Sequence, residues 1–222
     1  MWPLIFSVII FAQTAYSETV VAKIATILPK DEKRLFSISK ISIAIEFALN
    51  ELKSYDFRDR NITFNVSYAD SKCADAQGMN EAIKMYMHNM VDVFFGPNCD
   101  YSVAPVARQV TFWNLPLISG GAMARDFKIN KRLEYPLLTR VGPADFNTLS
   151  NFIVDFFGVM KWNNPYIIYD RMEQKGVLEE FCNLFTNSLH YNANYDYYKM
   201  EHPFNYRKIL TEVIGNTYAG EY

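Results

Sequence analysis

The sequence predicts an α/β fold of parallel sheets flanked by helices, with enough chain for two lobes. Short segments rich in Val, Ile and aromatic residues alternate with longer segments in which apolar residues recur every three or four positions. Half of the 222 residues are hydrophobic, which suffices for a sizeable core. A Gly-Pro break at residues 142–143 divides the alternation into two blocks.

The first block starts with a strand at residues 19–28, which is rich in Val, Ile and Thr and ends before Pro29. A helix is predicted at residues 75–90, because its apolar residues form a single stripe. The same two patterns predict the other elements of this block: helix 39–52, strand 62–68, strand 91–95, helix 101–113 and strand 115–119.

The second block repeats the alternation. Its elements are predicted as strand 137–141, helix 149–160, strand 165–170, helix 177–189, strand 195–200 and helix 205–214. The Gly142-Pro143 break is the predicted boundary between an N-terminal lobe at residues 18–142 and a C-terminal lobe at residues 143–222.

Residues 1–17 have the features of a secretory signal peptide. Residues 4–12 are almost wholly apolar, and small residues, Ala15 and Ser17, lie three and one positions before the expected cleavage point. The alternative is a buried N-terminal strand. No other apolar run approaches the length of a membrane span, so we expect a chain in the secretory pathway or outside the cell, where disulfides persist. The Asn-x-Thr/Ser sequences at Asn61 and Asn65 are candidate glycosylation sites.

Composition and motifs argue against several functions. The formal net charge is −2, with no basic excess, so nucleic acid is not an expected partner. The sequence has no G-x-S-x-G, P-loop or G-x-G-x-x-G motif, and its histidines are scattered, so we assign no catalytic residue, metal or cofactor. A secreted α/β enzyme of unknown chemistry remains the alternative class of function.

Loops that follow strands carry the most informative residues. Residues 96–99 follow a strand and open a helix, so their backbone N–H groups form either an anion site, for example for chloride, or an ordinary turn. Cys73 and Cys99 both lie just beyond a strand end at one edge of the predicted sheet. They are either joined in a disulfide or present as two buried thiols.

Four motifs resemble those of one receptor family. Residues 91–108 read VDVFFGPNCDYSVAPVAR, residues 113–122 read WNLPLISGGA, residues 138–143 read LTRVGP and residues 68–73 read YADSKC. In this order and spacing they resemble the extracellular ligand-binding region of natriuretic peptide receptors and receptor guanylyl cyclases. The resemblance implies a type I periplasmic-binding-protein-like fold, in which two α/β lobes are hinged around a ligand site.

The resemblance also implies a function and partners. In the family such a domain binds a peptide or small-molecule ligand, forms a homodimer and signals through lobe or dimer rearrangement at the cell-surface membrane. Asp75 and Tyr101 match positions that contact peptide hormone. The two aromatic residues that follow the family's C-lobe cysteine are here Asn183 and Leu184, so the ligand stays open, as among many invertebrate receptor cyclases.

Further residue roles follow from the same resemblance. The family's N-lobe disulfide matches Cys73 and Cys99. Its bound chloride is held by backbone N–H groups that match Asn98 and Cys99, together with a hydroxyl for which Ser71 is the candidate.

Cys182 matches the first cysteine of the family's C-lobe bridge, but no cysteine follows it. The final residues 220–222 resemble a G-D-Y that the family places after a further strand and helix. We therefore expect a truncated or exon-skipped product with an incomplete second lobe and an unpaired Cys182. The alternatives are a complete domain with a free buried thiol and a non-functional fragment.

Overall fold

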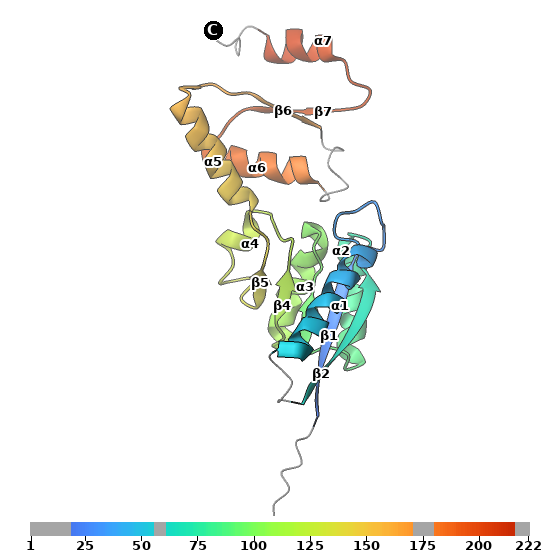
Figure 1. Ribbon diagram of the computed structural model, residues 1–222. Helices are drawn as coiled ribbons and strands as arrows, with labels where there is room; N and C mark the ends of the chain where they lie inside the picture. The colour runs from blue at the N-terminus through green and yellow to red at the C-terminus, as the bar shows by residue number, and fades with distance from the viewer. Residues whose placement is uncertain (1–18, 56–60, 171–179, 216–222) are drawn as a thin grey trace, which may run out of the picture.

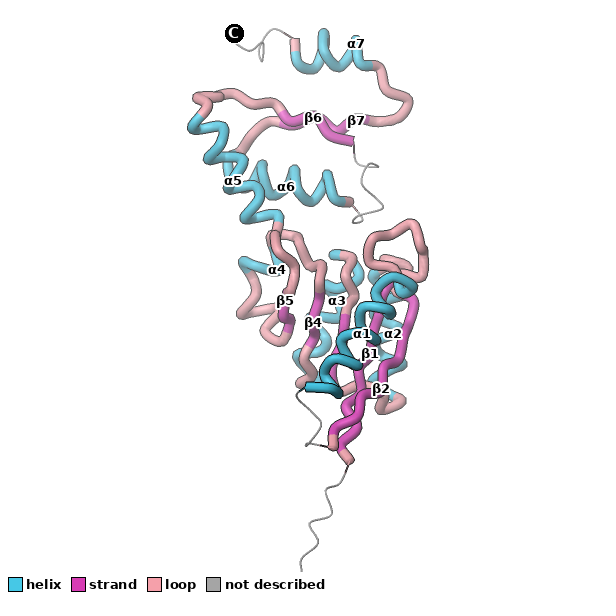
Figure 2. The backbone as a smooth tube through the Cα atoms, viewed as in Figure 1, coloured by secondary structure: helices cyan, strands magenta, loops and turns pink. Residues whose placement is uncertain are grey.

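The protein is described by a computed structural model over residues 19–55, 61–170 and 180–215. It is a mixed α/β structure in which helices pack around two parallel sheets (Figure 1), as the sequence predicts. Figure 2 shows strands and helices alternating along the chain in both parts. The predicted signal peptide lies outside the described residues.

The larger sheet has five parallel strands in the order β2-β1-β3-β4-β5. Strand β1 lies inside this sheet, between β2 and β3. Its apolar sequence suits that position, because Ile24, Ala25, Ile27 and Leu28 are all buried. The strand bounds are β1 Val20–Leu28, β2 Ile62–Asp70, β3 Val93–Phe95, β4 Leu117–Ser119 and β5 Leu138–Arg140. The last three strands are shorter than predicted because their ends leave the hydrogen-bonded ladder for loops.

Helices cover both faces of this sheet. Helices α2 (Asp75–Met87) and α3 (Asp100–Trp113) pack on one face, where Ala82, Val103 and Val106 join the main core. Helix α1 (Ile38–Tyr55) lies across the opposite face (Figure 1). The apolar stripe predicted for α2 packs on the core through Met79 and Ala82, whereas Met87 of the same stripe is 72% exposed.

A four-residue helix, α4 (Asp126–Ile129), was not predicted from the sequence. Arg108 of α3 fixes the chain around it: its Nε donates to Glu134 at 2.7 Å and its guanidinium donates to the Tyr135 hydroxyl at 2.7 Å. That hydroxyl donates to Asp126. Burial, then the hydrogen bond to Asp126, raises the pKa of Tyr135 above its usual range. The arginine that ends the A-P-V-A-R motif thus anchors the loop after β4.

The second part of the chain repeats the βαβ arrangement. Helix α5 (Phe146–Val159) leads to β6 (Ile167–Asp170), α6 (Phe181–Ala193) and β7 (Tyr197–Met200), and β6 pairs in parallel with β7. Trp162 follows α5 and packs edge-on against Phe156, with ring centroids 5.8 Å apart. The helix predicted at residues 205–214 consists of α7 (Tyr206–Lys208) followed by a π-helix at Ile209–Ile214. The start of the helix predicted at residues 177–189 lies outside the described residues.

Two glycines permit the close approach of loops at the carboxyl edge of the larger sheet. A Cβ at Gly121 would come within 1.8 Å of the Asn98 carbonyl oxygen, whereas one at the neighbouring Gly120 would make only an ordinary 3.7 Å contact. Gly96 has a φ of +77° and passes beside the carbonyl of Ile27. The loops after β3 and β4 are therefore in direct backbone contact.

A buried carboxyl group strengthens this contact. Asp100, the first residue of α3, is 4% exposed, and its Oδ1 accepts a hydrogen bond from the Ala124 N–H at 2.6 Å. Its Oδ2 is buried without a hydrogen-bond partner among the described residues. Burial raises the pKa of Asp100 to about 6, although the Ala124 and Met123 amides and Arg140 oppose this shift.

The raised pKa predicts a pH-dependent stability that the substitution Asp100→Asn removes. The folded protein holds a proton on Asp100 up to about pH 6, whereas the usual value is 3.8, so this group stabilises the fold at low pH and less as pH rises from 4 to 7. Asp100→Asn should therefore gain about 1–3 kcal/mol relative to wild type between pH 4 and pH 7.5. Urea unfolding at several pH values measures this difference.

Asp155→Asn, which removes an exposed carboxylate on α5, controls for the loss of one negative charge. Parallel stability curves for wild type and Asp100→Asn across this pH range would contradict the buried-carboxyl interpretation.

Candidate functional site

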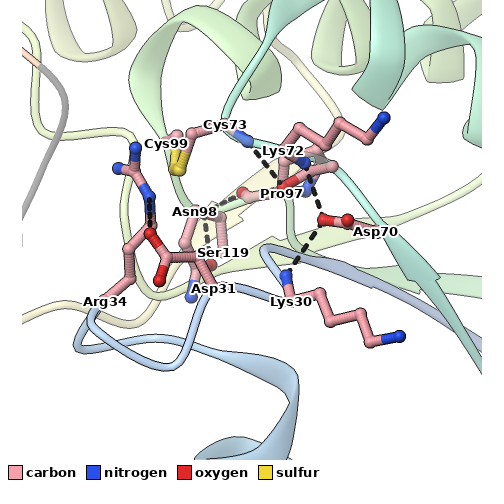
Figure 3. The surroundings of a disulfide bond; sticks show 11 residues. Lys30, Asp31, Arg34, Asp70, Lys72, Cys73, Pro97, Asn98, Cys99 and Ser119 are labelled. Carbon is pink, nitrogen blue, oxygen red and sulfur yellow. Dashed lines mark hydrogen bonds and ion pairs between the residues drawn. A yellow bond between two sulfur atoms is a disulfide. The ribbon is translucent and has the colours of Figure 1, made fainter.

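A disulfide bond joins the loops after β2 and β3 (Figure 3). The Cα atoms of Cys73 and Cys99 are 5.3 Å apart. Cys99 lies directly before α3, and Cys73 lies two residues before the start of α2. The bond therefore links the starts of α2 and α3. This is the pairing that the family resemblance implied.

The carboxylate of Asp70 joins two of the loops around the disulfide, because backbone N–H groups of both loops donate to it. Oδ1 of Asp70, the last residue of β2, accepts from the backbone N–H of Lys30 at 2.9 Å and of Lys72 at 2.8 Å (Figure 3). It thus joins the loop after β1 to the loop that carries Cys73. Three loops from neighbouring strands are held at one edge of the sheet.

The three residues expected to bind chloride lie at this edge and are buried. Ser71, Asn98 and Cys99 are 0%, 7% and 5% exposed. The Ser71 hydroxyl accepts from the Cys73 N–H at 3.2 Å, and the Asn98 side-chain oxygen accepts from the Gly120 N–H at 3.2 Å. Ser119, which sequence reasoning missed as a site residue, donates to the Pro97 carbonyl at 2.8 Å. The W-x-L-P-x-x-S motif had already marked this serine, so that signal was present in the sequence.

The two residues expected to contact ligand are both accessible. Asp75 is the first residue of α2 and is exposed, and Tyr101 is the second residue of α3 and is 45% exposed. Each lies two positions after one of the bridged cysteines. The disulfide therefore presents both side chains at the same end of the α2–α3 pair.

Other predicted residues are distributed elsewhere. Asn61 and Asn65 are both exposed, the first in the turn directly before β2 and the second on β2, the strand at the sheet edge. Cys182 is half-buried in the first turn of α6. Asn183 beside it accepts a hydrogen bond from the Tyr169 hydroxyl at 3.1 Å, so this side chain is occupied in holding α6 to β6.

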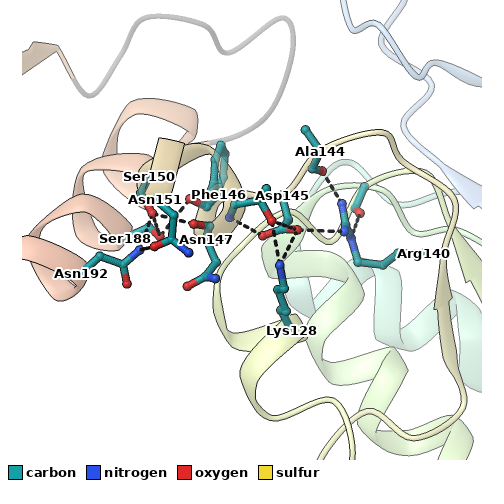
Figure 4. A network of polar contacts seen from close by, with 12 residues as sticks. Lys128, Arg140, Ala144, Asp145, Phe146, Asn147, Ser150, Asn151, Ser188 and Asn192 are labelled. Atoms are coloured by element: carbon teal, nitrogen blue, oxygen red, sulfur yellow. Dashed lines mark hydrogen bonds and ion pairs between the residues drawn. The ribbon is translucent and has the colours of Figure 1, made fainter. Parts of the chain in front are cut away.

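The chain crosses from the first sheet to the second part at residues 141–145, where charged side chains gather (Figure 4). The Arg140 guanidinium donates to the carbonyls of Gly121 and Ala144 and lies 3.9 Å from Asp145. Burial alone would raise the pKa of Asp145, but hydrogen bonds from Thr148 and the charge of Lys128 hold it below its usual value. The crossover is thus fixed by an ionised N-cap of α5.

A second polar network, between α5 and α6, was not predicted. The Ser150 and Ser188 hydroxyls are 2.9 Å apart, and Asn192 donates to Ser150 at 2.7 Å (Figure 4). Phe146 is fully buried beside them, with its ring 5.0 Å from that of Phe181. No local pattern marks polar residues that meet across two helices, so sequence reasoning had no signal for this network.

The described part of the chain has neither a metal-binding cluster nor a membrane-spanning helix. Its His, Cys, Asp and Glu side chains include no group of three that could hold a metal ion. In the same residues, no helix is both long and apolar enough to cross a membrane.

The sequence matches known proteins over this region. A family profile described as "Receptor family ligand binding region" (ANF receptor) matches residues 40–213. Human atrial natriuretic peptide receptor 3 is 31% identical over 160 residues, which cover 68% of this chain and 29% of that receptor. Rat atrial natriuretic peptide receptor 2 is 32% identical over 122 residues, 55% of this chain and 11% of that receptor.

The chain therefore spans less than a third of the length of these curated relatives. The match includes the disulfide loops, α2 and α3, the crossover and most of the second part. With the parallel α/β architecture, it shows that the chain belongs to the family of receptor ligand-binding regions typified by the natriuretic peptide receptors.

Proposed function

We propose that this chain is an extracellular, natriuretic-peptide-receptor-like domain that binds a peptide ligand. The observation that carries the proposal is the family match over residues 40–213, which includes β2–β5 of the larger sheet and both strands of the smaller one. In a full receptor the ligand would change the arrangement of lobes or of paired domains, and that change would carry the signal. Export through a signal peptide and glycans at Asn61 and Asn65 belong to the same proposal.

The proposed ligand surface is the end of the α2–α3 pair that carries Asp75 and Tyr101. A carboxylate and an exposed phenol ring suit a basic, partly apolar peptide, because they offer an ion pair and a flat apolar contact. The disulfide supports this role by fixing the two helix starts from which these side chains project.

A chloride ion at Ser71, Asn98 and Cys99 is a second part of the proposal. The backbone N–H groups of Asn98 and Cys99 would bind the ion. Helix α3 has 14 residues and starts directly after Cys99, so these N–H groups lie at the positive end of its dipole. Ser71 uses its oxygen to accept from Cys73, which leaves its O–H to donate to an anion. The buried setting would strengthen such bonds.

The outer surface of α2 and α3 supports the proposed homodimer. Met87 is 72% exposed and Phe112 is 83% exposed. Tyr86, next to Met87 in the chain, stacks on Trp113, next to Phe112, with ring centroids 4.3 Å apart. Apolar side chains at this density are typical of surfaces that bind another protein, and a second copy would bury them symmetrically.

Peptide binding is tested by titrating the secreted chain with atrial natriuretic peptide in a calorimeter. We expect saturable binding that Tyr101→Ala weakens roughly tenfold, because a central aromatic contact is lost. Asp75→Asn should weaken binding mainly at low salt. Tyr206→Ala, at an exposed tyrosine on α7, is the matched control. Absence of saturable binding would rule out this peptide, and equal weakening by the control would reject the surface.

Chloride binding is tested by thermal unfolding in sodium chloride and in sodium gluconate at equal ionic strength. A bound ion stabilises only the folded state, so chloride should raise the melting temperature by about 2–4 °C over gluconate. Ser71→Ala should remove most of this difference, whereas Ser42→Ala on α1 should keep it. Identical melting of the wild-type protein in both salts would reject the ion site.

Dimerisation is tested by sedimentation equilibrium. Met87→Glu places a charge in the proposed interface and should raise the dimer dissociation constant at least tenfold, roughly 1.4 kcal/mol. Phe47→Glu is a close control, because Phe47 is 68% exposed on α1, across the opposite face of the sheet. A wild-type chain that sediments as a monomer at about 50 μM, or equal effects of both variants, would refute this interface.

A further inference from the structure

One side chain spans the two parts of the molecule. Arg125 lies at the N-terminal boundary of α4, in the part built on the five-stranded sheet, and Tyr191 lies on α6 in the second part. The guanidinium carbon of Arg125 is 3.5 Å from the centroid of the Tyr191 ring. This distance is that of a close cation–π contact.

The backbone that carries Arg125 is held firmly. The preceding residue, Ala124, donates its N–H to the buried Asp100 carboxylate at 2.6 Å. One residue earlier, the Met123 carbonyl accepts from the N–H of Phe146, the first residue of α5, at 2.9 Å. The arginine therefore projects from a fixed point beside the crossover.

The Arg125 guanidinium contacts the Tyr191 ring and leaves one of its own N–H groups without a hydrogen bond within the described part of the chain. Its Nε is buried and has no hydrogen-bond partner among the described residues. A guanidinium that has lost water at one nitrogen gains more from the face of an aromatic ring than a fully hydrated one does. Tyr191 is 71% exposed, so most of its surface is in contact with solvent while its ring lies over the arginine.

We infer that Arg125 and Tyr191 form a clasp that holds the two lobes in the arrangement seen here. Contacts at the crossover, such as that of Lys128 with Asp145, hold the lobes close to the connecting segment, and the clasp adds a contact from α6 that opposes rotation of one lobe about the other. A ligand that changes the lobe arrangement must break or remake this contact. Its strength would then set how readily the arrangement changes.

The clasp is tested without ligand, so its failure would leave the proposed peptide-binding function untouched. Hydrogen exchange of the Phe146 amide reports on the crossover, because its acceptor is Met123. Tyr191→Leu removes the ring and should speed this exchange roughly threefold to tenfold. Tyr191→Phe keeps the ring without the hydroxyl and should leave exchange near the wild-type rate.

Two other amides show whether a variant has loosened a lobe as a whole. The Phe94 amide donates within the larger sheet region to Pro116, and the Asn194 amide donates to His190 at the end of α6. If Tyr191→Leu also speeds these amides, Arg125→Gln tests the same contact from the other lobe. Equal Phe146 exchange in Tyr191→Leu and Tyr191→Phe, or an unchanged rate in Arg125→Gln, would overturn the clasp.

Discussion

Close packing at the carboxyl edge of the five-stranded sheet determines how the rest of the molecule is arranged. At this edge the backbone at Gly121 lies against the Asn98 carbonyl, and the Cys73–Cys99 bridge closes a 26-residue separation beside them. On a chain-entropy estimate, a bridge over this separation stabilises the fold by roughly 3.5 kcal/mol. Because α2 and α3 begin beside the bridged cysteines, the bridge fixes where the two helices start and where the side chains of their first turns lie.

The same edge is connected to the second part through backbone atoms rather than through a large apolar surface. The segment 121–124 accepts hydrogen bonds from Arg140 and from the Phe146 amide and donates one to Asp100. A shift of the disulfide loops would therefore be felt at the start of α5. Side chains add to this connection, since Lys128 and Arg140 both lie close to Asp145 at the start of α5.

The order of helices and strands could be predicted from hydrophobic periodicity, although the periodicity does not say how deeply each stripe is buried: Phe152 and Phe156 of α5 are 62% and 42% exposed. The family motifs likewise identify the loops at Cys73 and Cys99 from the sequence. Helix α4 could not be found, since a four-residue helix has no periodic signal. Contacts such as Ser150 with Ser188, or Arg125 with Tyr191, join residues 38 and 66 positions apart, and the sequence carries no mark of such pairings.

The distribution of tryptophan gives each part of the molecule its own optical signal. The chain has three tryptophans, and one of them, Trp2, lies within the predicted signal peptide. The other two are Trp113, stacked on Tyr86 at the end of α3, and Trp162, which is 52% exposed beside Phe156. In a processed chain, the emission of one indole would follow the N-terminal lobe and that of the other the C-terminal lobe. Replacing either with Phe would leave a spectroscopically single-lobe protein, in which the melting of each half can be followed separately.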